Sequence, residues 1–240
     1  MFKQQVHGNH TLLSHPLYTS QVDINWFNAD FWQQQNKIVG AKKGRATAWF
    51  FKNNTLTAVL RHYWRGGLVG KLLSDQYFYL GLAQTRVYKE FALMMQLIEL
   101  GLNVPTPIAA KVTRNGLIYR GDIITEAVTG AKSVLDILIK RPLTTTELEI
   151  IASTIALFHR HGVYHADLNI NNILFNDAGE VYIIDFDRGE IKKPAKQWQQ
   201  GNMTRLERSF LKEQNRNKVF HWQTDDWLRL MTVYQQYLAN

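Results

Sequence analysis

The chain has 240 residues, is 45% hydrophobic, contains no cysteine and carries a formal net charge of +8. This length predicts one domain or a two-lobed domain with a sizeable core. The absence of cysteine excludes a disulfide framework, thiolate chemistry and cysteine metal sites. The positive charge favours an anionic partner, such as phosphates, nucleic acid or a membrane surface.

The N-terminal stretch is polar with scattered aromatic residues. Residues 1–15 hold no apolar segment of the kind that a signal peptide needs. No run of about 18 apolar residues occurs anywhere, so we expect no membrane-spanning helix. We expect residues 1–36, which include Trp26 and Trp32, to pack as a leader onto the first lobe.

A glycine-containing turn follows this leader. The β-prone runs 37–40 and 45–51 are joined by the sequence Gly40-Ala41-Lys42-Lys43-Gly44. Glycine lets backbone N–H groups approach a phosphate closely, so Gly40 and Gly44 are candidate residues of a phosphate-covering loop. With only two glycines, an ordinary hairpin turn remains the alternative.

The next strand and helix contain a basic and an acidic residue that are candidates for a phosphate-positioning pair. The third strand, 56–63, contains Arg61, whose permanent charge can bind a phosphate. The following helix, 85–100, is indicated by apolar residues at helical spacing and ends at Gly101. Glu90 in this helix is the candidate partner of Arg61. A surface-strand arginine and an exposed helix glutamate are the alternatives.

The middle of the chain predicts further regular structure. Three short strands are expected, at 105–110, 116–119 and 123–126. A short helix over 134–140 precedes a longer one. The longer helix begins at the capping box Thr144-x-x-Glu147 and ends at His161, before Gly162.

Polar groups lie at both ends of the next predicted hairpin. The apolar runs 173–175 and 181–184 flank an Asn/Asp/Gly turn, which indicates two antiparallel strands. Asp167 and Asn172 precede the hairpin, and Asp185 follows it. An oxygen-rich cluster of this kind suits Mg²⁺.

The spacing of these residues is typical of a phosphotransferase. His165-x-Asp167-Leu168-x-x-x-Asn172, followed by Asp185-Phe186, matches the catalytic-loop pattern of protein-kinase-like enzymes. It predicts Asp167 as the catalytic residue, Asn172 and Asp185 as Mg²⁺ ligands, and ATP as the donor. A lone His-x-Asp is usually structural, but this whole pattern is hard to obtain by chance. We expect His165 to support the loop rather than act as a general base.

The wider sequence resembles the Kdo kinase branch of the lipopolysaccharide-core sugar kinases. The resemblance covers roughly residues 37–230. It is carried by the segments 58–63, 65–67, 85–86, 90–91, 101–102, 104–107, 165–169 and 185–189.

This resemblance implies an α+β, protein-kinase-like fold of two lobes. A small antiparallel-sheet lobe is expected over 1–126, and a mostly helical, shortened catalytic lobe over 127–240. The implied reaction transfers phosphate from ATP to a hydroxyl of the 3-deoxy-D-manno-octulosonic acid (Kdo) sugar on a lipid A precursor. The implied location is peripheral, at the cytoplasmic face of the bacterial inner membrane. Asp187 is left open as a second metal contact or a turn residue.

Other features favour a small acceptor over a protein. Asn169 stands where protein kinases commonly have lysine, and no Ala-Pro-Glu sequence follows Asp185. Two alternatives to a Kdo kinase remain. One is another small-molecule kinase of the aminoglycoside or choline type. The other is a non-catalytic basic module that binds acidic glycolipid or nucleic acid, which the intact acidic motif residues argue against.

The C-terminal part holds most of the positive charge. From Arg188 to Lys218 there are nine basic and three acidic residues, with Trp198 inside this segment and Trp222 just after it. We expect Arg188, Arg205 and Arg208 to bind acidic groups of the glycolipid and the anionic leaflet around it. A solvated helix face is the alternative. No nucleic-acid-binding motif is present, so nucleic acid is not expected.

Overall fold

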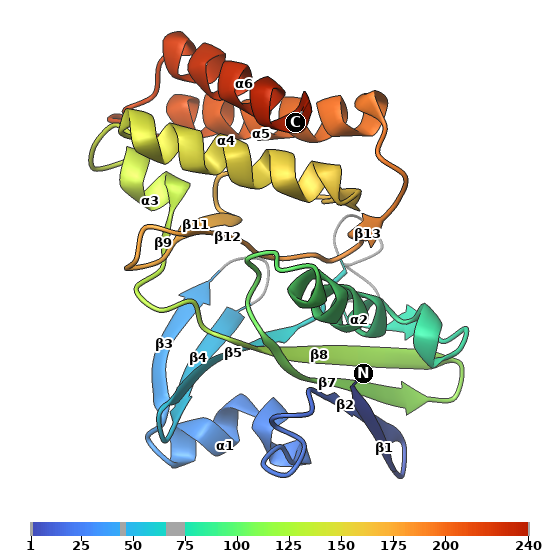
Figure 1. The fold of residues 1–240 in the computed structure, drawn as a ribbon. Coiled ribbons are helices and arrows are strands. Elements are labelled where there is room, and N and C mark those ends of the chain that lie inside the picture. Colours follow the sequence, from blue (N-terminus) through green and yellow to red (C-terminus); the bar gives the residue numbers. More distant parts are fainter. Residues whose placement is uncertain (1, 44–46, 66–74, 240) are drawn as a thin grey trace. The chain divides into compact units, whose positions relative to one another are not determined.

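The structure, a computed structural model, describes residues 2–43, 47–65 and 75–239 (Figure 1). The chain divides into two compact units. The first comprises Met1–Gln96 and Pro105–Ala127, and the second comprises Leu97–Val104 and Val128–Asn240. Strands and helices are mixed along the chain, as the expected α+β class requires. Within the described ranges, no helix combines the length and the apolar character needed to cross a membrane.

An eight-stranded antiparallel sheet forms the first unit, which confirms the sheet expected there. Across the sheet the strands run β1 (Lys3–His7), β2 (His10–Ser14), β7 (Pro107–Asn115), β8 (Ile118–Glu126), β5 (Leu56–His62), β4 (Thr47–Asn53) and β3 (Ile38–Lys43). The short strand β6 (Tyr77–Phe78) pairs with β8. The leader therefore supplies a hairpin, β1–β2, that the sequence analysis did not predict.

The long β7–β8 hairpin replaces the three shorter strands that were expected (Figure 1). β8 continues through Arg120, Gly121 and Asp122, which interrupt the apolar pattern. Backbone pairing does not depend on side-chain polarity, so polar residues can lie within a strand if their side chains are satisfied.

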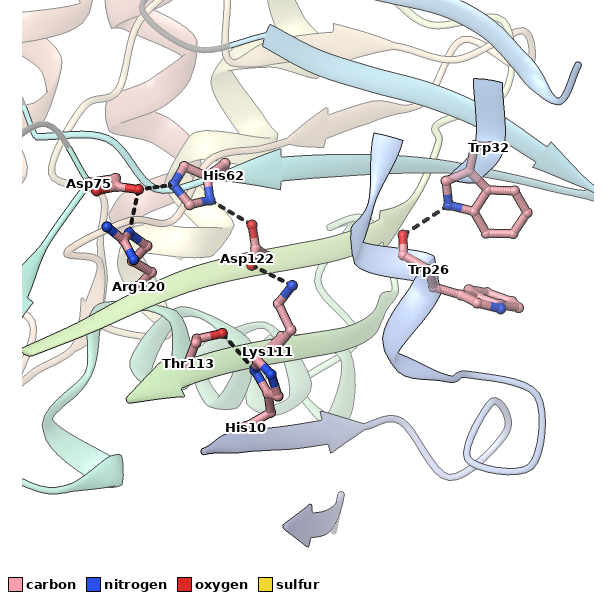
Figure 2. A network of polar contacts seen from close by, with 9 residues as sticks. All are labelled: His10, Trp26, Trp32, His62, Asp75, Lys111, Thr113, Arg120 and Asp122. Atoms are coloured by element: carbon pink, nitrogen blue, oxygen red, sulfur yellow. Dashed lines mark hydrogen bonds and ion pairs between the residues drawn. The ribbon is translucent and has the colours of Figure 1, made fainter. Parts of the chain in front are cut away.

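A polar network on the sheet satisfies these side chains (Figure 2). His62 Nδ1 lies 2.6 Å from Asp122, and its Nε2 lies 3.3 Å from Asp75. Lys111 approaches Asp122 to 3.2 Å, and Arg120 donates to Asp75 at 2.7 Å. Burial alone would lower the pKa of His62, but the hydrogen bond and charge of Asp122, together with Asp75, raise it. Side chains of β5, β7 and β8 are thus joined by charge as well as by the backbone.

Gly40 does not lie in a loop, contrary to the sequence-based expectation. It belongs to β3, where it pairs with Phe50 of β4 beside an irregularity in the register. A glycine at such a position is typical of a β-bulge, where backbone freedom is useful. Gly44, the other residue of the expected phosphate-covering loop, lies outside the described residues. β3 thus extends to Lys43, three residues beyond the expected strand end, and phosphate binding by Gly40 and Gly44 stays a prediction.

The leader packs onto the first unit, as expected, through aromatic side chains. It forms the short helices η1 (Ile24–Phe27) and α1 (Ala29–Gln34). Trp32 stacks on Phe51 of β4 with ring centroids 4.1 Å apart, and its indole N–H donates to the Trp26 carbonyl at 2.9 Å (Figure 2). Trp26, Trp32 and Phe51 are all buried. The indole polar atom is thus satisfied while its rings supply core area.

The predicted helix between β6 and β7 is α2 (Arg86–Glu99), which follows the single turn η3 (Leu82–Gln84). Its apolar stripe is buried, including Val87, Phe91 and Met94. The positive φ of Gly101 supports the predicted stop.

The second unit combines three long helices with short strands (Figure 1). Its helices are α3 (Val134–Leu138), α4 (Thr145–Arg160), α5 (Lys196–Arg216) and α6 (Thr224–Ala239). Its strands are β9 (Lys132–Ser133), β10 (Val163–Tyr164), β11 (Ile173–Phe175), β12 (Val181–Ile183) and β13 (Glu190–Ile191). The capping box at Thr144 and Glu147 is present as predicted.

Gly162 ends α4 at a position where only glycine fits. Its φ is +75°, and an added Cβ would lie 2.1 Å from the Lys192 carbonyl oxygen. This close approach lets the Lys192 N–H donate to the Gly162 carbonyl at 2.9 Å. The β10–β13 pairing, which flanks the loop after β10, depends on it.

Trp32→Ala tests whether the leader is part of the core. Loss of a buried, stacked Trp should reduce the free energy of unfolding by about 3–5 kcal/mol. Urea unfolding followed by circular dichroism measures the effect, with the exposed Leu17→Ala as the control. An unchanged unfolding midpoint for Trp32→Ala would mean that the leader is not part of the folded core.

Candidate active site

The predicted hairpin is present and brings the polar motif residues of the second unit together. β11 and β12 pair antiparallel, with Ile173 opposite Ile183. The Ile184 N–H donates to the Asn172 carbonyl at 3.0 Å, which extends the pairing beyond the strands. Asn172, at the end of the loop 165–172, therefore lies beside the residue that precedes Asp185.

Asp167 has a fixed backbone and an exposed carboxylate. Its N–H donates to His165 Nδ1 at 3.1 Å. Its carbonyl accepts hydrogen bonds from the side-chain amides of Asn172 at 3.0 Å and Asn169 at 2.8 Å. The side chain remains 59% exposed. Such a carboxylate is available to accept or orient a proton of a bound molecule.

His165 supports the loop, as expected, and is not placed as a general base. Because Nδ1 accepts from Asp167, Nε2 carries the proton and donates to the Ile184 carbonyl at 2.9 Å. Burial lowers the pKa of His165, which keeps the ring neutral. Its ring also contacts Phe186 at a centroid distance of 5.0 Å. His165 thus connects Asp167 to the strand end that leads to Asp185.

Three residues that sequence reasoning missed hold His165 in turn. Asn202 of α5 donates to the His165 carbonyl at 2.8 Å and accepts from its N–H at 3.2 Å. The same Asn202 oxygen lies 3.3 Å from His159 Nε2 of α4. Tyr234 of α6 donates to His159 Nδ1 at 2.7 Å. The helices α4, α5 and α6 therefore each contribute one polar side chain that supports the loop 165–172.

This supporting network is buried and uncharged. Burial lowers the pKa of His159 to about 4, so the ring is neutral near pH 7. With Nε2 donating and Nδ1 accepting, both ring nitrogens are satisfied. A buried neutral network whose members all have partners avoids the desolvation penalty of unpaired polar groups.

Asp185 begins a tight turn whose apolar member is anchored in the core. The φ angle of Asp185 is +66° and that of Arg188 is +61°, both in the left-handed region. Phe186 is fully buried, stacks against Phe158 at 6.1 Å, and accepts a hydrogen bond from the Gly189 N–H at 2.7 Å. Non-glycine residues rarely adopt such angles, and they cluster at functional sites.

Asn172 and Asp185 form a donor set that fits Mg²⁺. Both offer side-chain oxygen, and the Asn172 amide nitrogen is already engaged with Asp167, so its oxygen is the atom left for a cation. In the described part of the chain, no group of three or more His, Asp or Glu side chains is arranged around a metal position. Mg²⁺ suits a site with few protein ligands, because water and substrate phosphates complete its shell.

α5 carries most of the basic segment and places one arginine at the catalytic loop. Its buried face consists of Gln199, Asn202, Met203, Leu206 and Phe210. Arg205 and Arg208 are on the exposed face, and Arg205 Nη1 lies 3.5 Å from Asp167 Oδ1. Arg188 is also exposed, in the turn after Asp185. Arg205 is thus the candidate acceptor-binding residue that lies against Asp167.

Trp222 cannot act at a membrane–water interface, contrary to the sequence-based expectation. It is only 5% exposed and stacks on Phe210 of α5 at 3.7 Å. Trp198 is half-buried, and its indole N–H donates to the Lys193 carbonyl at 3.0 Å. The basic segment therefore lacks the exposed aromatic pair inferred from the sequence, because both rings pack within the second unit.

In the first unit, the predicted pair of Arg61 and Glu90 is present. The Arg61 guanidinium donates to Glu90 Oε1, and the Tyr63 hydroxyl donates to Glu90 Oε2. The Glu90 side chain is completely buried, whereas that of Arg61 is 28% exposed. Tyr63 lies two residues after Arg61, so alternation along the chain directs both side chains to one sheet face. The two-residue spacing from Arg61 is the sequence signal that could have identified Tyr63 as a second partner of Glu90.

Comparisons with known proteins show the family of this chain. The profile of the lipopolysaccharide kinase (Kdo/WaaP) family matches residues 29–234. A 3-deoxy-D-manno-octulosonic acid kinase from Vibrio vulnificus (strain YJ016) is 41% identical over 98% of this chain and 99% of its own length. Relatives of the same name are 43% identical in Vibrio parahaemolyticus, over 84% of each chain, and 38% identical in Mannheimia succiniciproducens, over 97% of this chain and 99% of the relative. The chain belongs to the lipopolysaccharide kinase (Kdo/WaaP) family.

Proposed function

We propose that this chain transfers the terminal phosphate of ATP to a hydroxyl of a Kdo sugar carried by a lipid A precursor. The observation that supports this best is the loop 165–172, whose hydrogen bonds fix the Asp167 backbone and leave its carboxylate exposed. The full-length similarity to proteins named 3-deoxy-D-manno-octulosonic acid kinase supports the choice of acceptor. It favours Kdo over the aminoglycoside or choline acceptors of other small-molecule kinases.

The fold that goes with this function is the two-lobed arrangement of protein-kinase-like enzymes. We assign the lobe of residues 1–126 to nucleotide binding and the lobe of residues 127–240 to catalysis and acceptor binding. The antiparallel sheet with α2 and the Arg61–Glu90 pair support the first assignment. The loop 165–172 and the β11–β12 hairpin support the second.

In the proposed mechanism, Asp167 accepts or orients the proton of the sugar hydroxyl. Asn172 and Asp185 would hold Mg²⁺, which would supply positive charge to neutralise the phosphates of the donor. Arg61, fixed by buried Glu90, positions the α- and β-phosphates. Arg205 keeps the Asp167 carboxylate oriented before the acceptor binds. Most of the rate enhancement then comes from positioning and charge neutralisation.

The proposed acceptor implies where the protein acts and what it binds. A lipid A precursor lies in a bilayer, so we propose peripheral association with the cytoplasmic face of the inner membrane. Arg188 and Arg208 are exposed cations that suit the carboxylate and phosphates of the glycolipid. The direct test is incubation with Mg-ATP and a Kdo-bearing lipid A precursor, read by mass spectrometry. The product should gain one phosphate on Kdo, and absence of that product would refute the acceptor assignment.

Asp167→Ala and Asp185→Ala should each abolish phosphate transfer, for different reasons. Asp167 faces the acceptor, whereas Asp185 holds the metal, so only Asp185→Ala should strongly weaken Mg²⁺-dependent ATP binding. Turnover assays and calorimetric titration with Mg-ATP separate the two effects. Asp177→Ala, an exposed acid in the β11–β12 turn, is the matched control. Wild-type turnover in both test variants would contradict the proposed kinase mechanism.

Arg61→Ala and Glu90→Gln should each raise the ATP requirement or lower turnover. Because the residues act as one unit, the double variant should lose less than the sum of the two single losses. A double-mutant cycle on kcat/KM for ATP measures this coupling. Additive losses would contradict a functional pair, even though the two side chains touch.

Arg205→Ser and Arg208→Ser should differ, although both remove one exposed charge from α5. Arg205 contacts Asp167, so its loss should lower kcat as well as raise the KM for the acceptor. Arg208→Ser should raise the acceptor KM alone and flatten its salt dependence. Steady-state kinetics at low and high salt tests both, with ATP binding as the internal control. Equal kinetic changes in the two variants would count against a role for Arg205 through Asp167.

A further inference from the structure

Three large apolar side chains are exposed at one end of the sheet in the first unit. Phe78 is 69% exposed, Leu80 80% and Leu117 77%. We call this group the apolar tip. Single exposed apolar residues are ordinary on protein surfaces, whereas neighbouring ones often mark an interaction site.

Strand pairing brings the backbone of these residues to the same end of the sheet. β6 pairs with β8 through Phe78 and Ile118, and the Tyr79 N–H donates to the Leu117 carbonyl at 2.9 Å. Leu117 lies in the turn of the long β7–β8 hairpin, where the strands end (Figure 1). The tip is therefore formed by two segments, β6 with the residues after it and the β7–β8 turn, at the end of the sheet.

Aromatic and basic side chains lie near the apolar tip, although two of the basic ones, Lys111 and Arg120, are paired with Asp122 and Asp75. Residues 76–89 and 111–121 contain five basic residues and no Asp or Glu. Arg114 is exposed, and its guanidinium lies 4.5 Å from the centre of the Tyr79 ring. The guanidinium also donates to the Gly116 carbonyl at 3.0 Å, within the β7–β8 turn.

This combination matches the chemistry of a membrane–water interface. Leucine and phenylalanine side chains gain free energy by leaving water for the acyl region. Aromatic rings with a polar group favour the headgroup level, and arginines are attracted to anionic headgroups. Exposed apolar side chains at the end of a sheet can enter a bilayer, whereas a protein partner would need a matching pocket.

We propose that the apolar tip inserts into the surface of an anionic lipid bilayer and holds the protein there. The proposal depends on the proposed function only for what the bilayer carries, because insertion itself needs no acceptor. It moves bilayer anchoring from the basic segment of the second unit, whose Trp222 is buried, to the β7–β8 end of the first unit. The arginines of α5 then serve the acceptor.

Vesicle sedimentation of the full chain tests the proposal. The probes are phosphatidylcholine vesicles and mixed phosphatidylcholine–phosphatidylglycerol vesicles. Phe78→Ser, Leu80→Ser and Leu117→Ser combined should weaken partitioning to the mixed vesicles by about tenfold or more. The matched control combines Leu157→Ser, Leu211→Ser and Leu228→Ser, which are 40%, 49% and 59% exposed on α4, α5 and α6. Circular dichroism establishes that each variant is folded.

Arg114→Gln separates insertion from electrostatic attraction. It should weaken binding to the mixed vesicles several-fold at low salt and leave the weaker binding to phosphatidylcholine unchanged. Equal vesicle binding by the tip variant and the wild type would overturn the proposal, as would equal losses in the tip and control variants. A wild-type dimer that the tip variant converts to a monomer, without a change in vesicle binding, would assign the tip to self-association instead.

Activity on a soluble acceptor distinguishes failure of this inference from failure of the proposed function. With Kdo free in solution, the tip variant should turn over like the wild type, because the tip holds no catalytic residue. With the lipid-borne acceptor in mixed vesicles, its apparent KM should rise by about tenfold, in line with the lost partitioning. If the wild type phosphorylates neither acceptor but binds vesicles through the tip, the proposed function fails and this inference stands.

Discussion

The hydrogen bonds around His165 are the constraint on which the candidate active site of the second unit depends. One ring nitrogen accepts from the Asp167 N–H, and the other donates to the Ile184 carbonyl, so a single imidazole joins the loop to the strand end before Asp185. Asn202 fixes the backbone of His165 itself. Since His165 and Asn202 are buried, movement of either would leave a buried polar group of the other unsatisfied, at a cost of about 1–3 kcal/mol per group. The exposed carboxylate of Asp167 is thereby carried on a rigid support.

In the first unit, too, a buried side chain orients a more exposed one, but here the buried side chain is charged. Glu90 is buried, and it remains acceptable there because Arg61 and Tyr63 each occupy one of its carboxylate oxygens. Removal of one partner from such a group is costly, because an uncompensated charge stays in a medium of low polarity. In both units, then, an accessible polar group is oriented by buried ones. The side chains of Asp167 and Arg61 are 59% and 28% exposed, whereas His165 and Glu90, which orient them, are buried.

Sequence reasoning succeeded where the interaction is local or has a fixed spacing. The β11–β12 hairpin follows from two apolar runs around a turn, and the capping box at Thr144 follows from a three-residue spacing. The Arg61–Glu90 pair was predicted because the motif places a cation on the third strand and an acid on the next helix. Gly40 was misplaced because a bulged strand and a glycine turn look alike when only two glycines mark them.

The sequence by itself therefore determined the reaction class, the residues of the loop 165–172 and the pair of Arg61 and Glu90, since short motifs mark each of them. Only the tertiary structure decided how the loop is held and what is exposed. Asn202, His159 and Tyr234 meet because α4, α5 and α6 pack together, and no local pattern marks such a meeting. Trp222 is buried against Phe210 of α5, whereas Phe78 and Leu117 of the first unit are exposed, although apolar character alone would rank them alike. Burial depends on which segments pack against one another, and this cannot be read from the order of residues along the chain.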